Sequence, residues 1–420
     1  MKKKLVDNKG ITLIVLVVTI VVLIILTTIT INMALGDNGI IQKAKDTEKK
    51  VNETEDITQS YINGLQQELK NQITNNTAKP NETIEDAKNT GKEFTDPKTE
   101  VTDSKGNKVV IPGGFMVAPD SGDTVQQGIV IEDVSASGDD NVKGSQFVWI
   151  PVGTFVKDDG STSNEIVLGR YTFNETNGTP TLVQAAYTTD NPENYKNEVV
   201  ISHSKELADY RPGVASSGLD GLNATAKDLA GFVKSAKENG GYYIARYEAS
   251  YASGSSVSDY KAASKKSIAN STSVMNYTVG TLWNYITQLE ASKVSINTYS
   301  KATTVKSDLM NSYAWDTAIV FIQEAGHANY ANKEDENGTL KNTGTTGDEV
   351  CKINDMASNL EEWTTEYSTR TSGGSINNAY CCSYRGNYYV NSYDYPGGRN
   401  SFSIADLGTR SGGVRFCLYM

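Results

Sequence analysis

The first pattern in the chain is an uncharged apolar run from Ile11 to Leu35, directly after a short, lysine-rich polar stretch over residues 1–10. With a rise of roughly 1.5 Å per residue, a helix of this length can cross the hydrocarbon core of a bilayer. Lysines before an apolar helix favour a cytoplasmic N-terminus. The pattern therefore predicts a transmembrane helix over residues 11–35, with the rest of the chain outside.

After this run the hydrophobic pattern weakens in two steps. In residues 36–75 apolar side chains recur at spacings of four to six residues, the later ones at helical spacing, which predicts a helical stalk. These side chains are Val51, Ile57, Tyr61, Leu65, Leu69 and Ile73. Residues 76–107 begin with a stretch that has almost no apolar content, and we predict a flexible linker there.

From residue 108 to the C-terminus, short apolar runs alternate with Gly, Pro and Asp turns. The runs predict strands over residues 109–117, 128–133, 145–155 and 240–250, with a hairpin turn at Asp158–Gly160. Apolar spacing predicts helices near residues 221–237, 280–292 and 312–323. Short strands mixed with a few helices indicate an α+β domain over residues 108–420.

Composition narrows the classes of function. The net charge of -11 leaves no basic surface for nucleic acid. The chain has 23 tyrosines and 36 glycines, which is typical of a loop-rich extracellular domain. It has no HExxH, no GxSxG and no phosphate-binding glycine loop, and neither His203 nor His327 lies near a recognisable nucleophile motif.

The cysteines leave two interpretations open. All of them follow residue 350, and none forms a CxxC pair, so a zinc site is not expected. An extracellular location allows one or two disulfides. The alternative is buried free thiols. The residues concerned are Cys351, Cys381, Cys382 and Cys417.

The order of the N-terminal signals resembles the prepilin signal of type IV pilins and their relatives. A basic leader, Gly10 and an apolar run follow one another in KGITLIVLVVTIVVLIIL, residues 9–26. The resemblance implies that a prepilin peptidase cuts after Gly10, so that the mature protein begins at Ile11. Pilins usually carry glutamate at the fifth mature position, which here is Val15, so entry into a pilus is not implied. The alternative is an uncleaved signal anchor.

Six segments of residues 108–420 resemble, in order, the formylglycine-generating-enzyme (sulfatase-modifying factor) superfamily. They are FVWIPVGTF, YYIARYEAS, YAWDTAIVFI, NDMASNLEEWTTEYS, YRG and the terminal GVRFCLYM. The resemblance implies an irregular C-type-lectin-like fold. Large residues within these segments are expected to hold the fold rather than perform chemistry; they are Trp149, Trp315, Trp363, Arg385 and Arg415.

The enzymes of that family oxidise a substrate cysteine with two nearby cysteines that bind copper. Here Cys381 and Cys382 are adjacent, and neighbouring side chains of a strand point to opposite faces of the sheet. They therefore match the copper-binding pair poorly. We expect a binding protein rather than an enzyme, with a cysteine oxidase of the sulfatase-modifying type as the alternative.

A tyrosine-rich segment supports binding. Six tyrosines fall between Tyr380 and Tyr395, and Asn and Ser fill much of the remainder. Tyrosine supplies rigid amphipathic contact area and Asn and Ser supply adaptable hydrogen bonds, as in antibody paratopes. The alternative is a packed tyrosine-rich loop. The predicted ligand-binding residues are Asn387, Tyr388, Tyr389, Asn391, Ser392, Tyr393, Asp394, Tyr395, Asn400 and Ser403.

The position of this segment is similar to that of the hypervariable residues in target proteins of diversity-generating retroelements, a branch of the same superfamily. In that branch, variable Asn, Tyr, Ser and Asp residues precede the closing strand, here GVRFCLYM. The resemblance implies that a retroelement diversifies the surface.

A calcium site is also implied by the superfamily resemblance. Asn359 and Glu362 match an Asn and an acid near the family's metal, whereas Glu361 replaces the usual tryptophan. Amide and carboxylate oxygens suit calcium. The alternative is a pair that caps a helix or stabilises a turn.

Together these features predict a bacterial cell-surface protein, anchored in the cell membrane with its head outside. Its expected partners are a prepilin peptidase, the membrane and an unidentified extracellular ligand, protein or glycan. Pilus subunits are a further candidate partner, since a minor structural pseudopilin is the remaining alternative.

Overall fold

The computed structural model of the chain divides into two units, Met1–Pro80 and Asn81–Met420, each described here by itself. The structure describes residues 18–27, 82–134, 140–186, 200–201, 207–208, 229–253, 261–266, 277–279, 282–284, 288–300, 304–334, 338–368, 371–372, 375–376, 381–389, 395–403 and 412–420.

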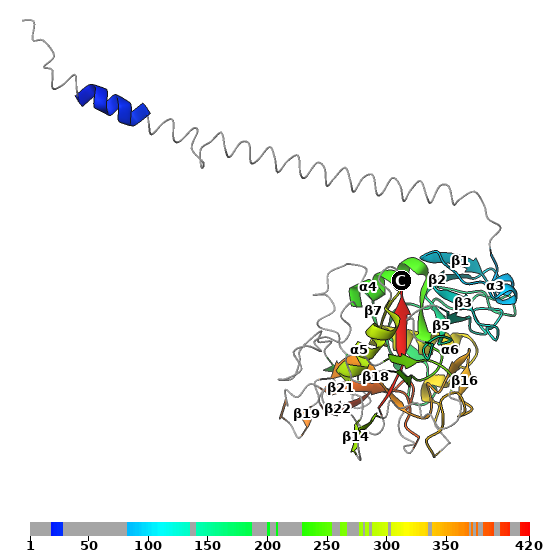
Figure 1. The fold of residues 1–420 in the computed structure, drawn as a ribbon. Helices are drawn as coiled ribbons and strands as arrows, with labels where there is room; N and C mark the ends of the chain where they lie inside the picture. Colours follow the sequence, from blue (N-terminus) through cyan, green and yellow to red (C-terminus); the bar gives the residue numbers. More distant parts are fainter. Residues whose placement is uncertain are drawn as a thin grey trace, which may run out of the picture. The chain divides into compact units, whose positions relative to one another are not determined.

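In the first unit, residues 18–27 form a helix, blue in Figure 1, whose large apolar side chains are exposed. The helix agrees with the prediction at these positions. The cleavage residues Gly10 and Ile11, the other residues of the predicted membrane helix and the stalk over residues 36–75 lie outside the described residues. Among the helices that the structure describes, none combines the length and the apolar content needed to span a membrane.

The head is built on a six-stranded sheet in which every neighbouring pair is antiparallel. The order across the sheet is β15 (Lys306–Leu309), β24 (Phe416–Tyr419), β10 (Gly241–Ala245), β5 (Gln146–Pro151), β4 (Val130–Asp133) and β3 (Phe115–Val117). The four predicted strand segments all lie in this sheet or extend into β2 (Lys108–Pro112). The C-terminal strand β24 lies between β15 and β10, so the last strand of the chain is inserted into the sheet next to its edge strand β15. Figure 1 shows this strand in red.

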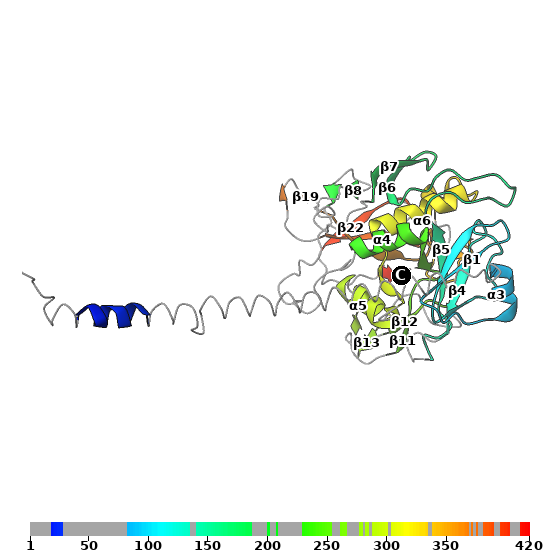
Figure 2. The ribbon, with the colours of Figure 1, turned by 90° about the horizontal axis from the view of Figure 1, so that it is seen from above.

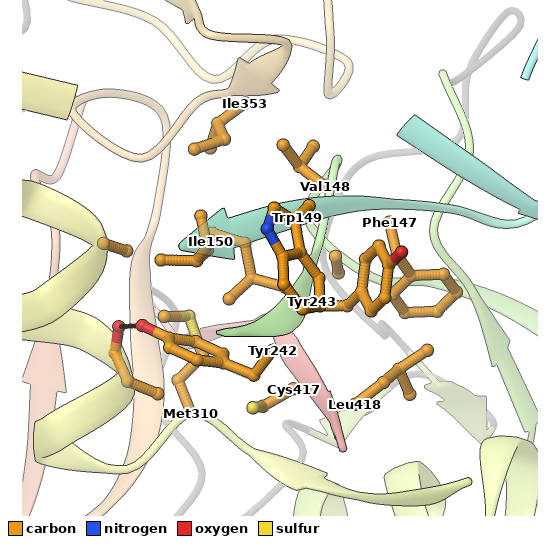
Figure 3. Close-up of a cluster of buried hydrophobic side chains, with 14 of the residues drawn as sticks. Phe147, Val148, Trp149, Ile150, Tyr242, Tyr243, Met310, Ile353, Cys417 and Leu418 are labelled. Atoms are coloured by element: carbon orange, nitrogen blue, oxygen red, sulfur yellow. Dashed lines mark hydrogen bonds between the residues drawn. The ribbon is translucent and has the colours of Figure 1, made fainter. Parts of the chain in front are cut away.

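Both faces of this sheet are covered, as two neighbouring tyrosines of β10 show. Their side chains point to opposite faces of the sheet, and each contacts a different element. Tyr242 donates its hydroxyl to the carbonyl oxygen of Ala314 at 2.6 Å, on α6 (Ser312–Glu324). Tyr243 donates to the carbonyl of Val110, on β2, at 3.0 Å and packs against Trp149, with 5.0 Å between the ring centroids. Figure 3 shows this aromatic centre of the core.

The helices match the predictions unevenly. The Asn311 side chain caps α6 at its predicted start. The helix α4 (Leu229–Asn239) covers the described part of the segment predicted near residues 221–237. The helix predicted at residues 280–292 is wrong in its first part, because β13 (Tyr277–Val279) and β14 (Leu282–Asn284) pair as a hairpin and α5 begins only later (Gln288–Tyr299). Short apolar runs do not distinguish a strand from a helix.

The flexible linker predicted over residues 76–107 is wrong for residues 82–107. The helix α3 (Ile84–Thr90) is capped by the Thr83 side chain, and β1 (Lys98–Thr102) pairs with β2 along its full length. Apolar side chains that are sparse in the sequence all face inward, and Phe94 and Val101 are buried in the core. Even a mostly polar segment therefore becomes part of the head when its few apolar residues share one face.

A second sheet of four strands carries the C-terminal motifs. Its order is β22 (Asn400–Ser403), β21 (Cys381–Arg385), β18 (Glu361–Ser368) and β23 (Gly412–Val414), with β18 and β23 parallel. Small hairpins surround the two sheets (Figure 2). They are β6 (Gly169–Phe173) with β7 (Pro180–Ala185), β8 (Val200–Ile201) with β9 (Leu207–Ala208), β11 (Ser250–Ser253) with β12 (Lys261–Ala263), β16 (Glu349–Val350) with β17 (Ile353–Asn354), and β19 (Thr371–Ser372) with β20 (Ser375–Ile376). The head is thus an α+β domain, as predicted.

Candidate functional site

The predicted binding segment lies mainly in the loop that joins β21 to β22, and we call residues 386–398 the tyrosine loop. The residues that bracket it, Arg385 and Arg399, are both buried and both pair with Asp316 of α6. Nη2 of Arg385 lies 2.5 Å from Oδ1 of Asp316, and Nη2 of Arg399 contacts the other oxygen, Oδ2. One fully buried carboxylate therefore holds both ends of the loop.

Further hydrogen bonds hold the C-terminal half of the loop by its backbone. Nε1 of Trp315 donates to the carbonyl of Pro396 at 2.8 Å, and Nε of Arg385 donates to the carbonyl of Gly398 at 2.7 Å. The backbone N–H of Gly397 donates to the carbonyl of Ala331 at 2.9 Å. All three bonds use main-chain atoms of the loop, so they do not depend on the loop's side chains.

Two of the predicted tyrosines form a pair in the N-terminal half of the loop. Tyr388 and Tyr389 are half-buried, and their rings meet edge to face with 4.6 Å between centroids. The backbone N–H of Tyr389 donates to the carbonyl of Asn359 at 3.1 Å. Tyr395, at the far end, is also half-buried. The structure therefore brings aromatic side chains that remain accessible onto a backbone with fixed ends.

Asn387 is a correction to the predicted set, because its side chain is completely buried. Its Oδ1 accepts a hydrogen bond from the backbone N–H of Tyr388 at 2.9 Å, and its Nδ2 donates to the carbonyl of Lys333 at 3.4 Å. It follows Gly386, whose φ of +91° lies in the left-handed region. Asn387 therefore builds the turn that leads into the loop and does not belong to an exposed surface.

The other members of the predicted set are less fully described. Asn391, Ser392, Tyr393 and Asp394 lie outside the described residues. Asn400 and Ser403 belong to β22, where they pair with Tyr384 and Cys381 of β21. Their side chains are outside the described part of the structure.

The residues matched to a calcium site have other partners. Oδ1 of Asn359 accepts from the backbone N–H of Lys341 at 2.9 Å, and Nδ2 donates to Glu248 at 2.6 Å. The Glu362 carboxylate is fully buried and accepts from Nε and Nη2 of Arg415, at 2.6 Å in the shortest contact. A calcium ion bound to Glu362 would face a guanidinium, so these residues, as placed, do not fit the ion.

The backbone conformation of Asn359 explains why an Asn stands at this position. Its φ is +73°, a conformation that Asn tolerates better than most residues. This matches the turn-stabilising alternative. Among the residues that the structure describes, no three or more His, Cys, Asp or Glu side chains gather where they could hold a metal.

The carboxyl groups near Arg415 are buried, and burial shifts their pKa values. Burial raises the pKa of Glu362 to about 7, although Arg415 opposes the shift. Burial also raises the pKa of Asp355, which accepts hydrogen bonds from the hydroxyls of Thr343 and Thr346.

The comparisons with known proteins add no relative. No protein-family model, no curated protein and no solved structure matches the chain.

The described thiols are weak nucleophiles. Cys351 and Cys417 are buried and form no disulfide, which matches the free-thiol interpretation for these two. Burial raises the pKa of Cys351 to about 12 and also raises the pKa of Cys417, so neither forms the reactive thiolate readily. Cys381 and Cys382 occupy neighbouring positions of β21, with side chains outside the described part.

The sequence did not reveal the residues that hold the ends of the tyrosine loop, which we call its frame: Asp316, Arg385 and Arg399. Arg385 and Arg399 bracket the tyrosine-rich segment in the sequence, but Asp316 was missed, although it follows Trp315 in the motif YAWDTA. Two arginines that flank a segment do not by themselves indicate a fixed loop. Only their shared contact with Asp316 does, and Asp316 is far from both arginines in the sequence.

Proposed function

We propose that the chain is a cell-surface protein, held in the membrane by its N-terminal helix, whose head binds an extracellular ligand through the tyrosine loop. The observation that carries this proposal is the half-buried pair of Tyr388 and Tyr389 on a loop with both ends fixed by Asp316. A fixed backbone lowers the entropy lost on binding. Tyrosine supplies large contact area with few torsions.

The anchoring pattern favours diversification of this loop. Trp315, Arg385 and Ala331 bind backbone atoms of Pro396, Gly398 and Gly397, so these contacts do not depend on which side chains stand at positions 388, 389 and 395. We propose a retroelement as the source of variation, in line with the resemblance described above. The test is genomic. A reverse transcriptase gene and a near-repeat of the 3′ end beside the gene would support it, and their absence would leave a fixed adhesin.

The tether follows from the proposed prepilin signal. A prepilin peptidase cuts between Gly10 and Ile11, and the head then stands outside the cell. Mass spectrometry of the mature protein should find Ile11 at its start. An intact Met1 would leave a signal anchor, and recovery of the chain in sheared pili would favour the pseudopilin alternative.

The proposal includes no cysteine oxidation. The reason is the poor match of the adjacent Cys381 and Cys382 to the copper-binding cysteine pair, because neighbouring side chains of a strand point to opposite faces of the sheet. Incubation of the chain with copper, oxygen and a cysteine peptide should yield no formylglycine. Conversion that is lost in Cys381→Ser or Cys382→Ser would instead establish the oxidase.

The binding surface is tested with a double variant, Tyr388→Ala with Tyr389→Ala. Truncating a tyrosine at the centre of an interface costs about 2 kcal/mol or more of binding, which is roughly thirtyfold in Kd. Because such costs are not additive, the double variant should lose binding by more than about thirtyfold and up to about 800-fold. The measurement uses arrays of glycans and of cell-surface protein ectodomains, first to find a ligand and then to titrate it. Leu182→Ala, which removes an exposed apolar side chain from β7, is the control.

Thermal unfolding of the same variants separates binding from folding. Both should melt close to the unchanged chain, because half-buried and exposed positions contribute little to stability. A double variant that folds and binds normally would place the ligand elsewhere. A double variant that unfolds would show that the tyrosines belong to the core.

A further inference from the structure

A cleft of about 700 Å³ opens between the β1–β2 hairpin, the loop after β5 and the C-terminal end of α4. Figure 1 shows α4 and this hairpin as neighbours at one end of the head. The volume lies within the roughly 300–1,000 Å³ that small-molecule sites occupy. None of its lining residues belongs to the tyrosine loop, so it is a separate feature.

Both apolar and charged side chains line the cleft. Val110, Pro151 and Phe155 are buried apolar residues of the lining. Lysines and glutamates from β1, β2 and α4 line the same space. This mixture suits a ligand with one apolar face and several polar groups.

Two of the lysines have only neutral oxygens as partners among the described contacts. Nζ of Lys98 donates to Oδ1 of Asn239 at 3.1 Å, and Nζ of Lys237 donates to the carbonyl of Ala186 at 2.6 Å. In contrast, Lys108 pairs with Glu100 at 2.9 Å. Burial lowers the pKa of Lys237, because a buried ammonium loses part of its hydration. Each of these ammonium groups can therefore donate a charge-assisted hydrogen bond to a negative group in the cleft without first giving up a described carboxylate partner.

The remaining groups select the kind of anion. Glu238 is exposed at the cleft, and α4 ends there, which adds the partial negative charge of a helix C-terminus. These acceptors repel a multiply charged phosphate more strongly than a singly charged carboxylate, and they can receive hydrogen bonds from hydroxyl groups. A sugar ring also offers a C–H face to the apolar lining.

We propose that this cleft binds a sugar that carries a carboxylate. Lys98 and Lys237 hold the carboxylate, Glu238 and Asn239 receive hydroxyl groups, and the ring packs on Val110 and Pro151. The site is independent of the tyrosine loop, so its success or failure does not decide the proposed function.

The test measures binding of glucuronate, galacturonate and N-acetylneuraminate to the full chain in detergent micelles by ligand-observed NMR. Glucose and galactose are the neutral controls. At least one acidic sugar should bind, and the neutral sugars should bind at least tenfold more weakly. Lys98→Gln and Lys237→Gln should each raise the Kd at least fivefold.

The matched control is Lys234→Gln, which removes an exposed lysine from the same helix outside the cleft. It should leave the Kd unchanged. The proposal is overturned if no acidic sugar binds, if the neutral sugars bind equally well, or if Lys234→Gln weakens binding as much as the cleft variants do. Thermal melting checks each variant. If Lys237→Gln unfolds, the exposed Lys98→Gln decides the outcome alone.

Discussion

Replacing Asp316 by Asn tests the frame of the tyrosine loop. The substitution keeps the shape of the side chain but removes the charge that faces Arg385 and Arg399, whose side chains are 0% and 4% exposed. It also disturbs the hydrogen bond that Oδ2 accepts from the backbone N–H of Tyr171 at 2.8 Å. Both buried guanidiniums then lose the negative charge of Asp316.

The size of the effect follows from this geometry. Breaking a buried ion pair by removing one partner costs about 3–5 kcal/mol, because the other charge remains buried and uncompensated. Asp316 serves two arginines, so we expect the upper part of this range, about 4–5 kcal/mol. With an unfolding entropy of roughly 2.1 cal/mol/K per residue, a head that spans residues 81–420 loses about 1.4 °C in Tm per kcal/mol. The expected decrease in Tm is therefore about 6 °C.

The assay combines denaturant unfolding with hydrogen exchange. The free energy of unfolding should fall by the amount given above, and amide protons of residues 386–398 should exchange faster than in the unchanged chain. Asp159→Asn, at a fully exposed position, is the matched control and should change neither. If Asp316→Asn lowers stability by less than about 1 kcal/mol, or if exchange in the loop is unchanged, the paired arginines do not hold the loop.

Two further predictions concern buried positions. Burial raises the pKa of Glu362 from its ordinary 4.5 to about 7. Between these pH values the folded chain holds a proton that the unfolded chain releases. The free energy of unfolding should therefore fall by roughly 1–3 kcal/mol as the pH rises from about 4.5 to about 7. Denaturant titrations at several pH values measure this slope, and a slope that persists in Glu362→Gln would assign it to other groups. Gly397→Ala should cost about 1–3 kcal/mol, because a Cβ there would lie 2.9 Å from Cδ2 of Phe173 and 3.0 Å from the carbonyl oxygen of Ala331. An unchanged Tm would show that this segment can shift away.

Strands with strong apolar patterns were predictable from the sequence. The runs that contain Trp149 and Tyr242 fill the centre of the larger sheet, where burial dominates other preferences. The helix α6 was predictable because its apolar periodicity starts directly after a capping Asn. The apolar pattern and the capping residue that predict such elements lie within about a dozen residues of one another, so no distant partner is needed to recognise them.

Other features could not be predicted because they depend on remote partners. Phe94 and Val101 looked like isolated apolar residues in a polar segment. The pairing of β1 with β2 places Val101 in the core, and a bridge to Phe115 of β3 places Phe94 there. Asn387 belongs to the same Tyr/Asn/Ser-rich segment as the predicted binding residues that follow it, so the sequence does not distinguish it from them. In the structure its side chain is buried, where it bonds to the carbonyl of Lys333 in the turn after Gly386. The residues that fix the loop, Asp316 above all, lie far from it in sequence.

The way in which the loop is held leads to a last prediction about which positions can vary. The contacts to Pro396, Gly398 and Tyr389 use backbone atoms, so a different side chain at position 389 leaves its hydrogen bond to Asn359 intact. Asn387 and Gly397 differ, because the first uses its amide to build a turn and the second has no room for a Cβ. Sequencing the gene in many isolates of the source should therefore find positions 388, 389 and 395 variable and positions 387 and 397 constant. Variation at 387 or 397 as frequent as at 388 would contradict the frame described here, whereas uniform constancy across the loop would leave a fixed binding surface.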